Sequence, residues 1–240
     1  MNAINGELLQ GLCEILDDVT SGGPVCTVLL TGSGRAFCAG GDLNVFAEMG
    51  GDPDAFAYLV GLMHDAERRM RQLPVPIVCL VNGIAAAGGL ELMLSADFCY
   101  AAESARIGDA HQRYGQMGGG GALTFLPRLI GPPRARELIY SGRLLSAEEA
   151  LSWGLVNRVV ADEDLLEAGV AFARDVASAS PLAIANAKDV MRQGWEIGTG
   201  VDAALDFEVK RTLEYCATSE DAREGLAAFG EKRVPRFLAR

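Results

Sequence analysis

The sequence predicts an α/β fold from three observations. An apolar run at 77–81, a glycine-rich loop at 82–89 and a helical pattern at 90–94 follow one another, and a second apolar run returns at 98–102. Strands and helices that alternate in this way are typical of α/β architecture. Half of the 240 residues are apolar and 22% are charged, as in ordinary globular proteins. A chain of this length buries a substantial core.

The first half of the chain contains both helical and strand patterns. Apolar residues at helical spacing predict helices over 5–18 and 54–72, and Pro74 and Pro76 close the second. Continuous apolar runs predict buried strands over 25–30, 77–81 and 98–102. The helix at 90–94 is apolar on nearly every side, so we expect it to be interior. The small-residue stretch 37–43 is expected to be a loop, and the glycine run 118–121 to open another helix.

The second half is predicted to be mostly helical. Helical patterns cover 133–140, 146–152, 162–178, 181–193, 199–217 and 219–229. No repeat of 20 to 50 residues is evident. The C-terminal half of the chain is therefore predicted to be a helical appendage.

Charge and motif content exclude several classes of protein. The net charge of −11 argues against nucleic-acid binding, which needs a concentrated positive surface. No apolar run reaches the roughly 18 residues of a membrane span, and the N-terminus lacks a leader pattern. Six scattered cysteines without a Cys-x-x-Cys pair fit a reducing cytoplasm and give no sign of a metal site. The sequence contains no P-loop motif, no nucleophile-elbow motif of α/β-hydrolases and no zinc-protease motif. The Gly32-Ser33-Gly34 turn is not a dinucleotide fingerprint, because Phe37 stands in place of its third glycine.

Two glycine-rich loops and one acidic residue are the first candidates for a functional site. Each loop follows a predicted strand and offers backbone N–H groups near a helix start, where negative charge is favoured. The loops together are able to form an oxyanion hole, although packing alone more often explains such turns. Glu91 lies in an apolar helix, where a carboxylate must be paired, protonated or functional. A functional role and a structural role, in which a buried hydrogen bond satisfies the carboxylate, explain this placement equally well. His64 has charged neighbours and is expected at the surface.

Three segments carry a family resemblance that covers almost the whole chain. Residues 37–43 resemble the first signature of the crotonase (enoyl-CoA hydratase/isomerase) superfamily, and 82–92 with Ala96 and Asp97 resemble the second. Residues 224–237 are similar to the family's C-terminal element. The resemblance implies a core over residues 1–180, built as a spiral of β-β-α units, and a helical C-terminal trimerisation region over 181–240. The protein would then be a homotrimer or a dimer of trimers. The resemblance further implies that the family's N-terminal strand, which helps to hold the CoA nucleotide, is missing before Asn2.

The resemblance also implies roles for individual residues. Gly41 and Gly88 match the two oxyanion-hole positions, and Glu91 matches the first catalytic glutamate. Coenzyme A is then part of an acyl-CoA thioester substrate, and no cofactor is bound permanently. The resemblance also implies six substrate-binding positions: Ala39, Gly40, Asp42, Leu43, Phe229 and Lys232. Positions like the last two, Phe229 and Lys232, reach the CoA moiety in the family, often across a subunit boundary.

One catalytic position departs from the family pattern. His111 stands where hydratases have their second glutamate, and an imidazole is suited to acid–base work at neutral pH. Relatives that cleave β-diketones by a retro-Claisen route resemble this chain here, but they pair the histidine with an aspartate nine residues later, where this chain has Gly120. Asp109 is a fallback acid. Gly118 replaces a usual proline, which predicts a more flexible loop.

The function predicted from the resemblance is addition of water to a 2-enoyl-CoA. Glu91 would be the general base and His111 the proton donor or orienting group. An enoyl-CoA isomerase, a β-diketone hydrolase and a catalytically silent CoA-binding protein remain alternatives. Candidates for the pocket wall are Phe46, Met49 and Met117.

Overall fold

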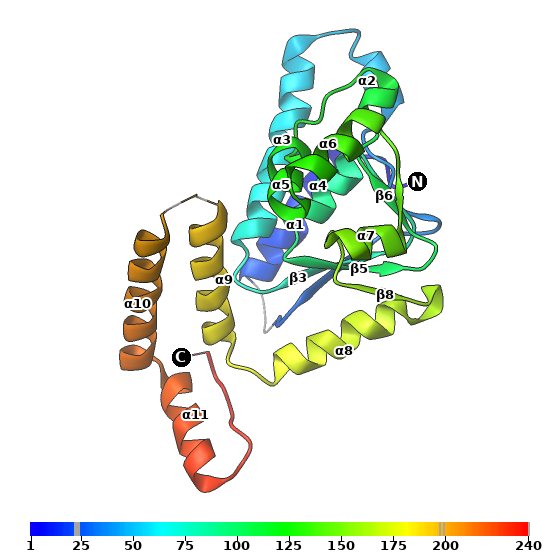
Figure 1. Ribbon diagram of the computed structural model, residues 1–240. Helices are drawn as coiled ribbons and strands as arrows, with labels where there is room; N and C mark the ends of the chain where they lie inside the picture. Colours follow the sequence, from blue (N-terminus) through cyan, green and yellow to red (C-terminus); the bar gives the residue numbers. More distant parts are fainter. Residues whose placement is uncertain (22–24, 197, 199, 240) are drawn as a thin grey trace. The chain divides into compact units, whose positions relative to one another are not determined.

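The computed structural model describes residues 1–21, 25–196, 198 and 200–239, which form two compact units. The second unit contains residue 171 onward together with two short segments, 25–28 and 72–76. The first unit contains the rest of the described chain and both β-sheets. Figure 1 shows the elements with their labels.

The two sheets have four strands each. One sheet has the order β1-β3-β5-β8, from Val28–Thr31, Ile77–Val81, Phe98–Ala102 and Arg158–Val160. The other has the order β2-β4-β6-β7, from Ala36–Cys38, Ile84–Ala86, Arg106–Gly108 and Leu145–Ser146. The pairs β3/β5, β5/β8, β2/β4 and β4/β6 are parallel, and β6/β7 is antiparallel.

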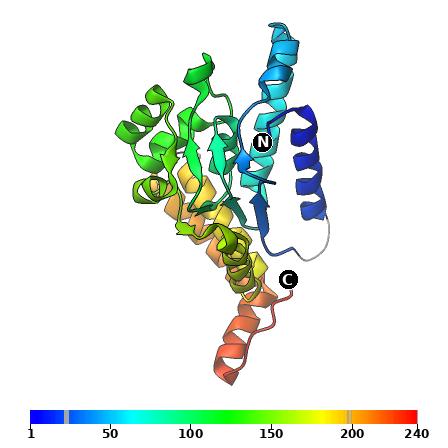
Figure 2. The same ribbon diagram turned by 90° about the vertical axis from the view of Figure 1, so that its right-hand side faces the viewer.

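A β-β-α order recurs along the first unit. Strands β3 and β4, one from each sheet, lead into α4 (Gly88–Leu94), and β5 and β6 lead through a 3-10 turn (η1, His111–Tyr114) to α5 (Ala122–Ile130). Figure 2 shows the strands between α1 (Gly6–Ser21) on one side and the green helices on the other. This is the spiral of β-β-α units that the resemblance implied.

Burial explains why these segments became strands and an interior helix. All five residues of β3 are buried, and β3 pairs with β5 so that Cys79 lies opposite Cys99. Six of the seven residues of α4 are buried, which confirms its predicted interior position. The strand expected at 25–30 is shifted to Val28–Thr31. Strands β2 and β4 were read as loop, because each is only three residues long and lies in a segment rich in glycine or alanine.

Helix α3 (Pro53–Gln72) confirms the helix predicted at 54–72 and presents one buried face to the core. Four of its buried residues are apolar or small, and the fifth is an acid, Glu67, with 1% of its surface exposed. His64 on the same helix is exposed, as predicted.

The remaining helices of the first unit cover the segment after the glycine run. Helices α6 (Pro132–Ser141) and α7 (Ala147–Trp153) match the predicted ranges within two residues. A 3-10 turn (η2, Asp162–Asp164) and α8 (Leu165–Ala177) together replace the single helix expected at 162–178. Helix α8 begins in the first unit, and its residues from 171 onward belong to the second. The short strands β7 and β8 were missed, since two or three residues carry no readable alternation.

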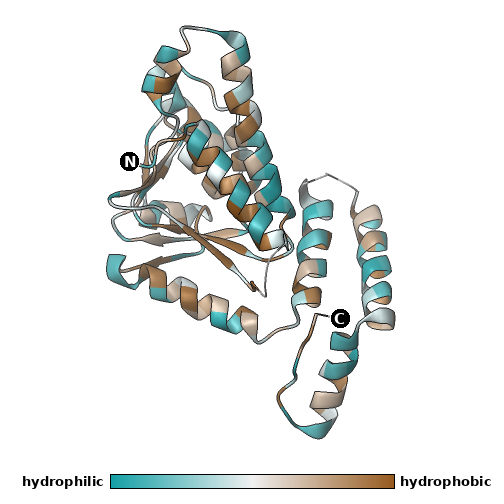
Figure 3. Ribbon diagram, turned by 180° about the vertical axis from the view of Figure 1, so that it is seen from behind, coloured by the Kyte–Doolittle hydropathy of each residue, from teal (hydrophilic) through white to brown (hydrophobic). Residues whose placement is uncertain are grey.

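The second unit is helical. It contains α9 (Pro181–Glu196), α10 (Val201–Thr218) and α11 (Glu220–Glu231). Ser180 donates to the Asp221 carboxylate over 2.7 Å, and Tyr215 donates to Ser180 over 3.3 Å. Figure 3 shows hydrophobic and hydrophilic residues alternating along these helices. Among the described helices, none is long and apolar enough to cross a membrane.

Candidate active site

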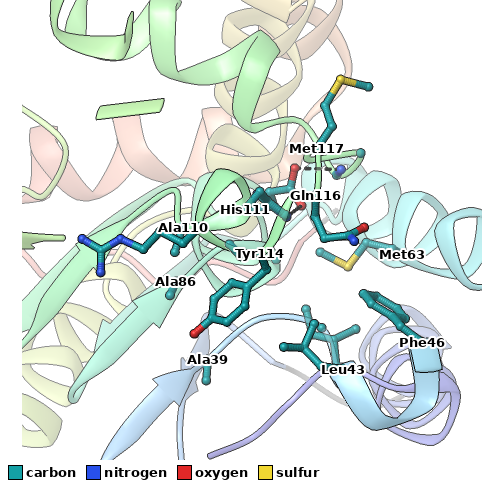
Figure 4. Close-up of a pocket in the computed structure, with 18 of the residues that line it drawn as sticks. Ala39, Leu43, Phe46, Met63, Ala86, Ala110, His111, Tyr114, Gln116 and Met117 are labelled. Atoms are coloured by element: carbon teal, nitrogen blue, oxygen red, sulfur yellow. Dashed lines mark hydrogen bonds and ion pairs between the residues drawn. The ribbon is translucent and has the colours of Figure 1, made fainter. Parts of the chain in front are cut away.

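A cavity of about 450 Å³ lies in the first unit, where the two glycine loops meet. Its wall includes Gly41 and Gly88 from these loops, and Glu91 and His111. Figure 4 shows how α2 (Leu43–Glu48), α3 and the loop after η1 enclose the space, with the labelled side chains Leu43, Phe46, Met63, Tyr114, Gln116 and Met117. Residues from three separate segments of the sequence therefore border one space.

The glycine loops approach each other as closely as main chains allow. Gly40 has φ +100°, and a Cβ on it would lie 3.0 Å from the Ala86 carbonyl oxygen and 3.5 Å from the Gly88 nitrogen. A Cβ on Gly88 would lie 3.7 Å from the Gly41 nitrogen. Within the described chain, the amides of Gly41 and Gly88 donate to no backbone carbonyl. Two adjacent amides without a backbone acceptor thus border the cavity.

The turn before α4 has an unusual backbone conformation. Ala87, the N-cap of α4, has φ +51° and ψ −120°, a region that costs a non-glycine residue about 1–3 kcal/mol. Its N–H donates to the Gly108 carbonyl over 3.1 Å, which ties the turn to β6. The strained turn places Gly88 at the first helical position, where N–H groups have no partner within the helix.

Glu91 is held by main-chain donors. Its Oε1 accepts from the N–H groups of Gly120 at 2.8 Å and Ala122 at 3.2 Å, and the residue is 3% exposed. Burial raises the pKa of Glu91 above its usual value, and Asp109 adds to this, whereas His111 and the two amides oppose it. Oε1 therefore accepts from both amides, and Oε2 is the oxygen that faces His111 Nε2.

His111 lies between two carboxylates. Its Nδ1 contacts Asp109 Oδ1 in a short hydrogen bond, and its Nε2 lies 3.9 Å from Glu91 Oε2. Asp109 is fully buried. Burial alone would lower the pKa of His111, but the hydrogen bond and charge of Asp109 and the charge of Glu91 outweigh it and raise the pKa above its usual value. The arrangement favours the imidazolium form and directs Nε2 towards Glu91.

The comparisons with known proteins establish the family. The family model for enoyl-CoA hydratase/isomerase matches residues 1–240. The chain belongs to the enoyl-CoA hydratase/isomerase family. The 1,2-epoxyphenylacetyl-CoA isomerase of Escherichia coli is 36% identical, over 100% of this chain and 91% of its own. The short-chain-enoyl-CoA hydratase of Clostridium acetobutylicum is 32% identical, over 97% and 88%.

Solved structures of the enoyl-CoA hydratase/isomerase family share the fold. The crystal structure of enoyl-CoA hydratase from Bacillus anthracis matches with a TM-score of 0.92 at 38% identity, over 99% of this chain and 91% of that one. The crotonase-like α/β fold predicted from the resemblance is therefore confirmed.

Two glycines, Gly118 and Gly120, lie directly against the side chains of the site. A Cβ on Gly118 would lie 2.8 Å from Glu91 Oε1 and 3.1 Å from the His111 ring. A Cβ on Gly120 would lie 2.9 Å from Glu91 Oε2. Gly118, read from the sequence only as a sign of flexibility, is thus a position where a proline ring would collide with Glu91 and His111.

The predicted substrate-binding residues fall into two groups. Ala39 and Leu43 line the cavity, whereas Gly40 and Asp42 do not. Asp42 caps α2 by accepting from the Asn44 N–H over 3.0 Å. Phe229 and Lys232 belong to the second unit, on α11 and at its C-cap; both are exposed and neither lines this cavity.

Sequence reasoning missed some residues of the site. Of the pocket-wall candidates, Phe46 and Met117 line the cavity and Met49 does not. Asp109, treated only as a fallback acid, is the carboxylate that contacts His111. Glu67 received no role, although its place four residues after Met63 and three before Met70 put it on the apolar face of the predicted helix.

Proposed function

We propose that the protein adds water to a 2-enoyl-CoA thioester. The observation that carries the proposal is the placement of Glu91 Oε2 and His111 Nε2 3.9 Å apart, in a cavity also lined by Gly41 and Gly88. A gap of this size is too wide for a direct hydrogen bond but suits one oxygen atom that bonds to both groups from the side. The relatives with hydratase in their names support the same chemistry.

The amides of Gly41 and Gly88 would hold the thioester oxygen. Addition of water at the β-carbon creates an enolate whose charge collects on this oxygen. Preorganised backbone donors stabilise such charge by about 3 to 4 kcal/mol each in well-studied oxyanion holes. Ala39, Gly40, Asp42 and Leu43 would shape the loop that approaches the thioester.

Glu91 and His111 would divide the proton transfers. As the water oxygen bonds to the β-carbon, Glu91 Oε2 takes a proton from the water. The enolate then collapses as His111 Nε2 gives its proton to the α-carbon. The proton on Glu91 passes to His111 and restores the starting state, so every proton is accounted for. Asp109 would hold the imidazole in the orientation that this cycle needs.

The Asp109–His111 contact also favours a second candidate, a β-diketone hydrolase. Such an enzyme uses a carboxylate–histidine pair to activate water for attack on a carbonyl carbon, and Asp109 supplies the carboxylate that Gly120 lacks. An isomerase needs only one proton shuttle, for which Glu91 suffices, and a relative with isomerase in its name is 36% identical.

We further propose that residues 181–240 form a trimerisation region in the cytoplasm, giving a homotrimer or a dimer of trimers. Helix α10 exposes an apolar stripe at four-residue spacing, Val201, Leu205, Val209 and Leu213, each more than half exposed. Contiguous apolar surface of this kind marks protein interfaces. Phe229, which is 85% exposed, and Lys232 would then contact the CoA moiety of a substrate across a subunit boundary.

Three substrates test the assignment. Hydration of crotonyl-CoA removes the absorbance of the conjugated thioester, isomerisation of a 3-enoyl-CoA creates it, and cleavage of a cyclic β-diketone consumes the diketone chromophore. We expect the first reaction to be fastest. Turnover of the diketone alone would instead establish the hydrolase. CoA binding without any turnover would establish a silent CoA-binding protein.

A further inference from the structure

Glu67 is a buried acid that the mechanism above does not use. It lies on the core face of α3 among Leu59, Met63, Ala66 and Met70, and it is 1% exposed. Within the described chain, neither of its carboxyl oxygens has a hydrogen-bond partner. A buried carboxylate without hydrogen bonds is strongly unfavourable, whereas an apolar residue would pack at this position without cost. Packing therefore does not explain this acid.

The carboxyl group of Glu67 lies just behind the catalytic carboxylate. A Cβ on Gly120 would lie 2.5 Å from Glu67 Oε1 and 2.9 Å from Glu91 Oε2. The two oxygens are therefore no farther apart than these two distances together, a span that one bridging water covers with two bonds of about 2.8 Å. Gly120 is the residue between them, and its missing side chain leaves the path open.

We propose that Glu67 is a positioning residue for Glu91: a neutral carboxylic acid whose hydrogen is directed past Gly120 towards Glu91 Oε2. The inference rests on the proposed function, in which Oε2 is the reactive oxygen. Two backbone amides hold Oε1. Glu67 would supply the corresponding donor for Oε2 through one bridging water and would orient this oxygen towards the substrate.

The charges around the pair support the neutral form of Glu67. Burial, followed by the charge of Glu91 on α4, raises the pKa of Glu67 to about 9, although Arg71 one turn along α3 opposes the shift. On the other side of Glu91 lie His111 and Asp109, while Gly120 and Ala122 contribute only main-chain amides. Two carboxyl groups this close therefore carry one charge at neutral pH.

An experiment without catalysis tests the protonation state. The infrared spectrum of wild type at pH 7 minus that of Glu67→Gln should contain the carbonyl band of a protonated, buried carboxylic acid. Glu148→Gln, which changes an exposed glutamate of α7, is the matched control and should show no such band. A difference spectrum with only carboxylate bands for Glu67→Gln would overturn the proposal, whatever reaction the protein catalyses.

The pH dependence separates positioning from packing. Removing a hydrogen-bond donor to a carboxylate raises the pKa of that carboxylate by about one unit or more. Glu67→Leu should therefore move the acidic limb of the kcat/KM profile, which reports Glu91, to higher pH by that amount. It should also lower kcat more than it changes KM. Glu67→Gln retains a donor and should keep the limb in place. A Glu67→Leu profile that overlays wild type would show that Glu67 only fills space.

Failure of the proposed function is distinguishable from failure of this inference. If the protein does not hydrate crotonyl-CoA, the ionisation of Glu91 is followed instead by infrared titration, with Glu91→Gln as the reference. An upward shift of that titration in Glu67→Leu but not in Glu67→Gln supports the positioning role. An identical titration in all three proteins contradicts it.

Discussion

The ring of His111 bridges two acids, since its Nδ1 contacts Asp109 and its Nε2 faces Glu91 Oε2 at 3.9 Å. Asp109 is fully buried, and its second oxygen has no hydrogen-bond partner within the described chain. The contact with Asp109 therefore orients the imidazole and favours a proton on Nδ1.

Glu91→Gln should abolish turnover and leave ligand binding nearly intact. The amide keeps the size of the side chain and can still accept from the amides of Gly120 and Ala122, but it cannot take a proton. Initial rates with crotonyl-CoA and calorimetric titration with a saturated acyl-CoA measure the two effects. Turnover comparable to wild type would remove Glu91 from the mechanism.

His111→Ala should slow hydration by about 10²-fold or more, the usual scale of general acid–base help. Wild-type activity should follow a bell-shaped pH profile. It falls at low pH as Glu91 takes up a proton, at a pKa raised above its usual value, and at high pH as His111 loses one, at a pKa that is also raised. The alkaline limb should disappear in His111→Ala. An unchanged rate and profile would exclude His111 from proton transfer.

Asp109→Asn should move the alkaline limb to lower pH by about one unit, because the charge and hydrogen bond that hold the proton on His111 are lost. The variant keeps the shape of a side chain that is fully buried, so thermal unfolding should stay cooperative. The kcat/KM profile and an NMR titration of His111 report the shift independently. A limb that stays in place would mean that Asp109 has only a structural role.

Gly120→Ala should reduce kcat strongly, since its Cβ would lie 2.5 Å from Glu67 Oε1 and 2.9 Å from Glu91 Oε2. Gly61→Ala on α3 is the control, because a Cβ there meets nothing within 4 Å. Replacing a helical glycine by alanine at that site should stabilise the protein by up to about 1 kcal/mol. Equal kcat values for the two variants would contradict the close packing of the carboxyl groups.

Glu67→Gln should flatten the dependence of stability on pH. In wild type the folded protein keeps a proton on Glu67 up to about pH 9, whereas the unfolded chain loses it near the usual pKa of glutamate. The free energy of unfolding should therefore fall as pH rises between these values, by at most about 1.4 kcal/mol per pH unit. Urea unfolding at pH 6 and pH 8.5 measures the slope. Parallel slopes in wild type and variant would mean that Glu67 is ionised in the folded protein.

Much of the fold was readable from the sequence, because long buried strands and amphipathic helices leave clear periodic patterns. Strands β3 and β5 and helix α3 were predicted within one residue at each end. Strand β4 was not, because Ile84–Ala86 lies inside a glycine and alanine loop and pairs with strands distant in the sequence. Short strands are specified by their partners rather than by their own residues.

The site residues that belong to the family motifs were predicted from the sequence, whereas the contacts between individual side chains were not. Gly41, Gly88, Glu91 and His111 line one cavity, as the resemblance led us to expect. The pairing of Asp109 with His111 was not predictable, because two residues of separation in sequence does not fix the direction of either side chain. Glu67 was detectable from its spacing on the helix, but its approach to Glu91 depends on the path of the loop at Gly120.

The two amides that hold Glu91 Oε1 have a consequence for how this enzyme can change over evolution. Every residue except proline brings the same N–H group, so mutation at position 122 leaves the anchor of the base untouched as long as the new side chain fits. Position 120 tolerates much less, since even one added methyl collides with both acids. Substitutions in the surrounding walls can therefore change the shape of the cavity while the Glu91 carboxylate keeps its position.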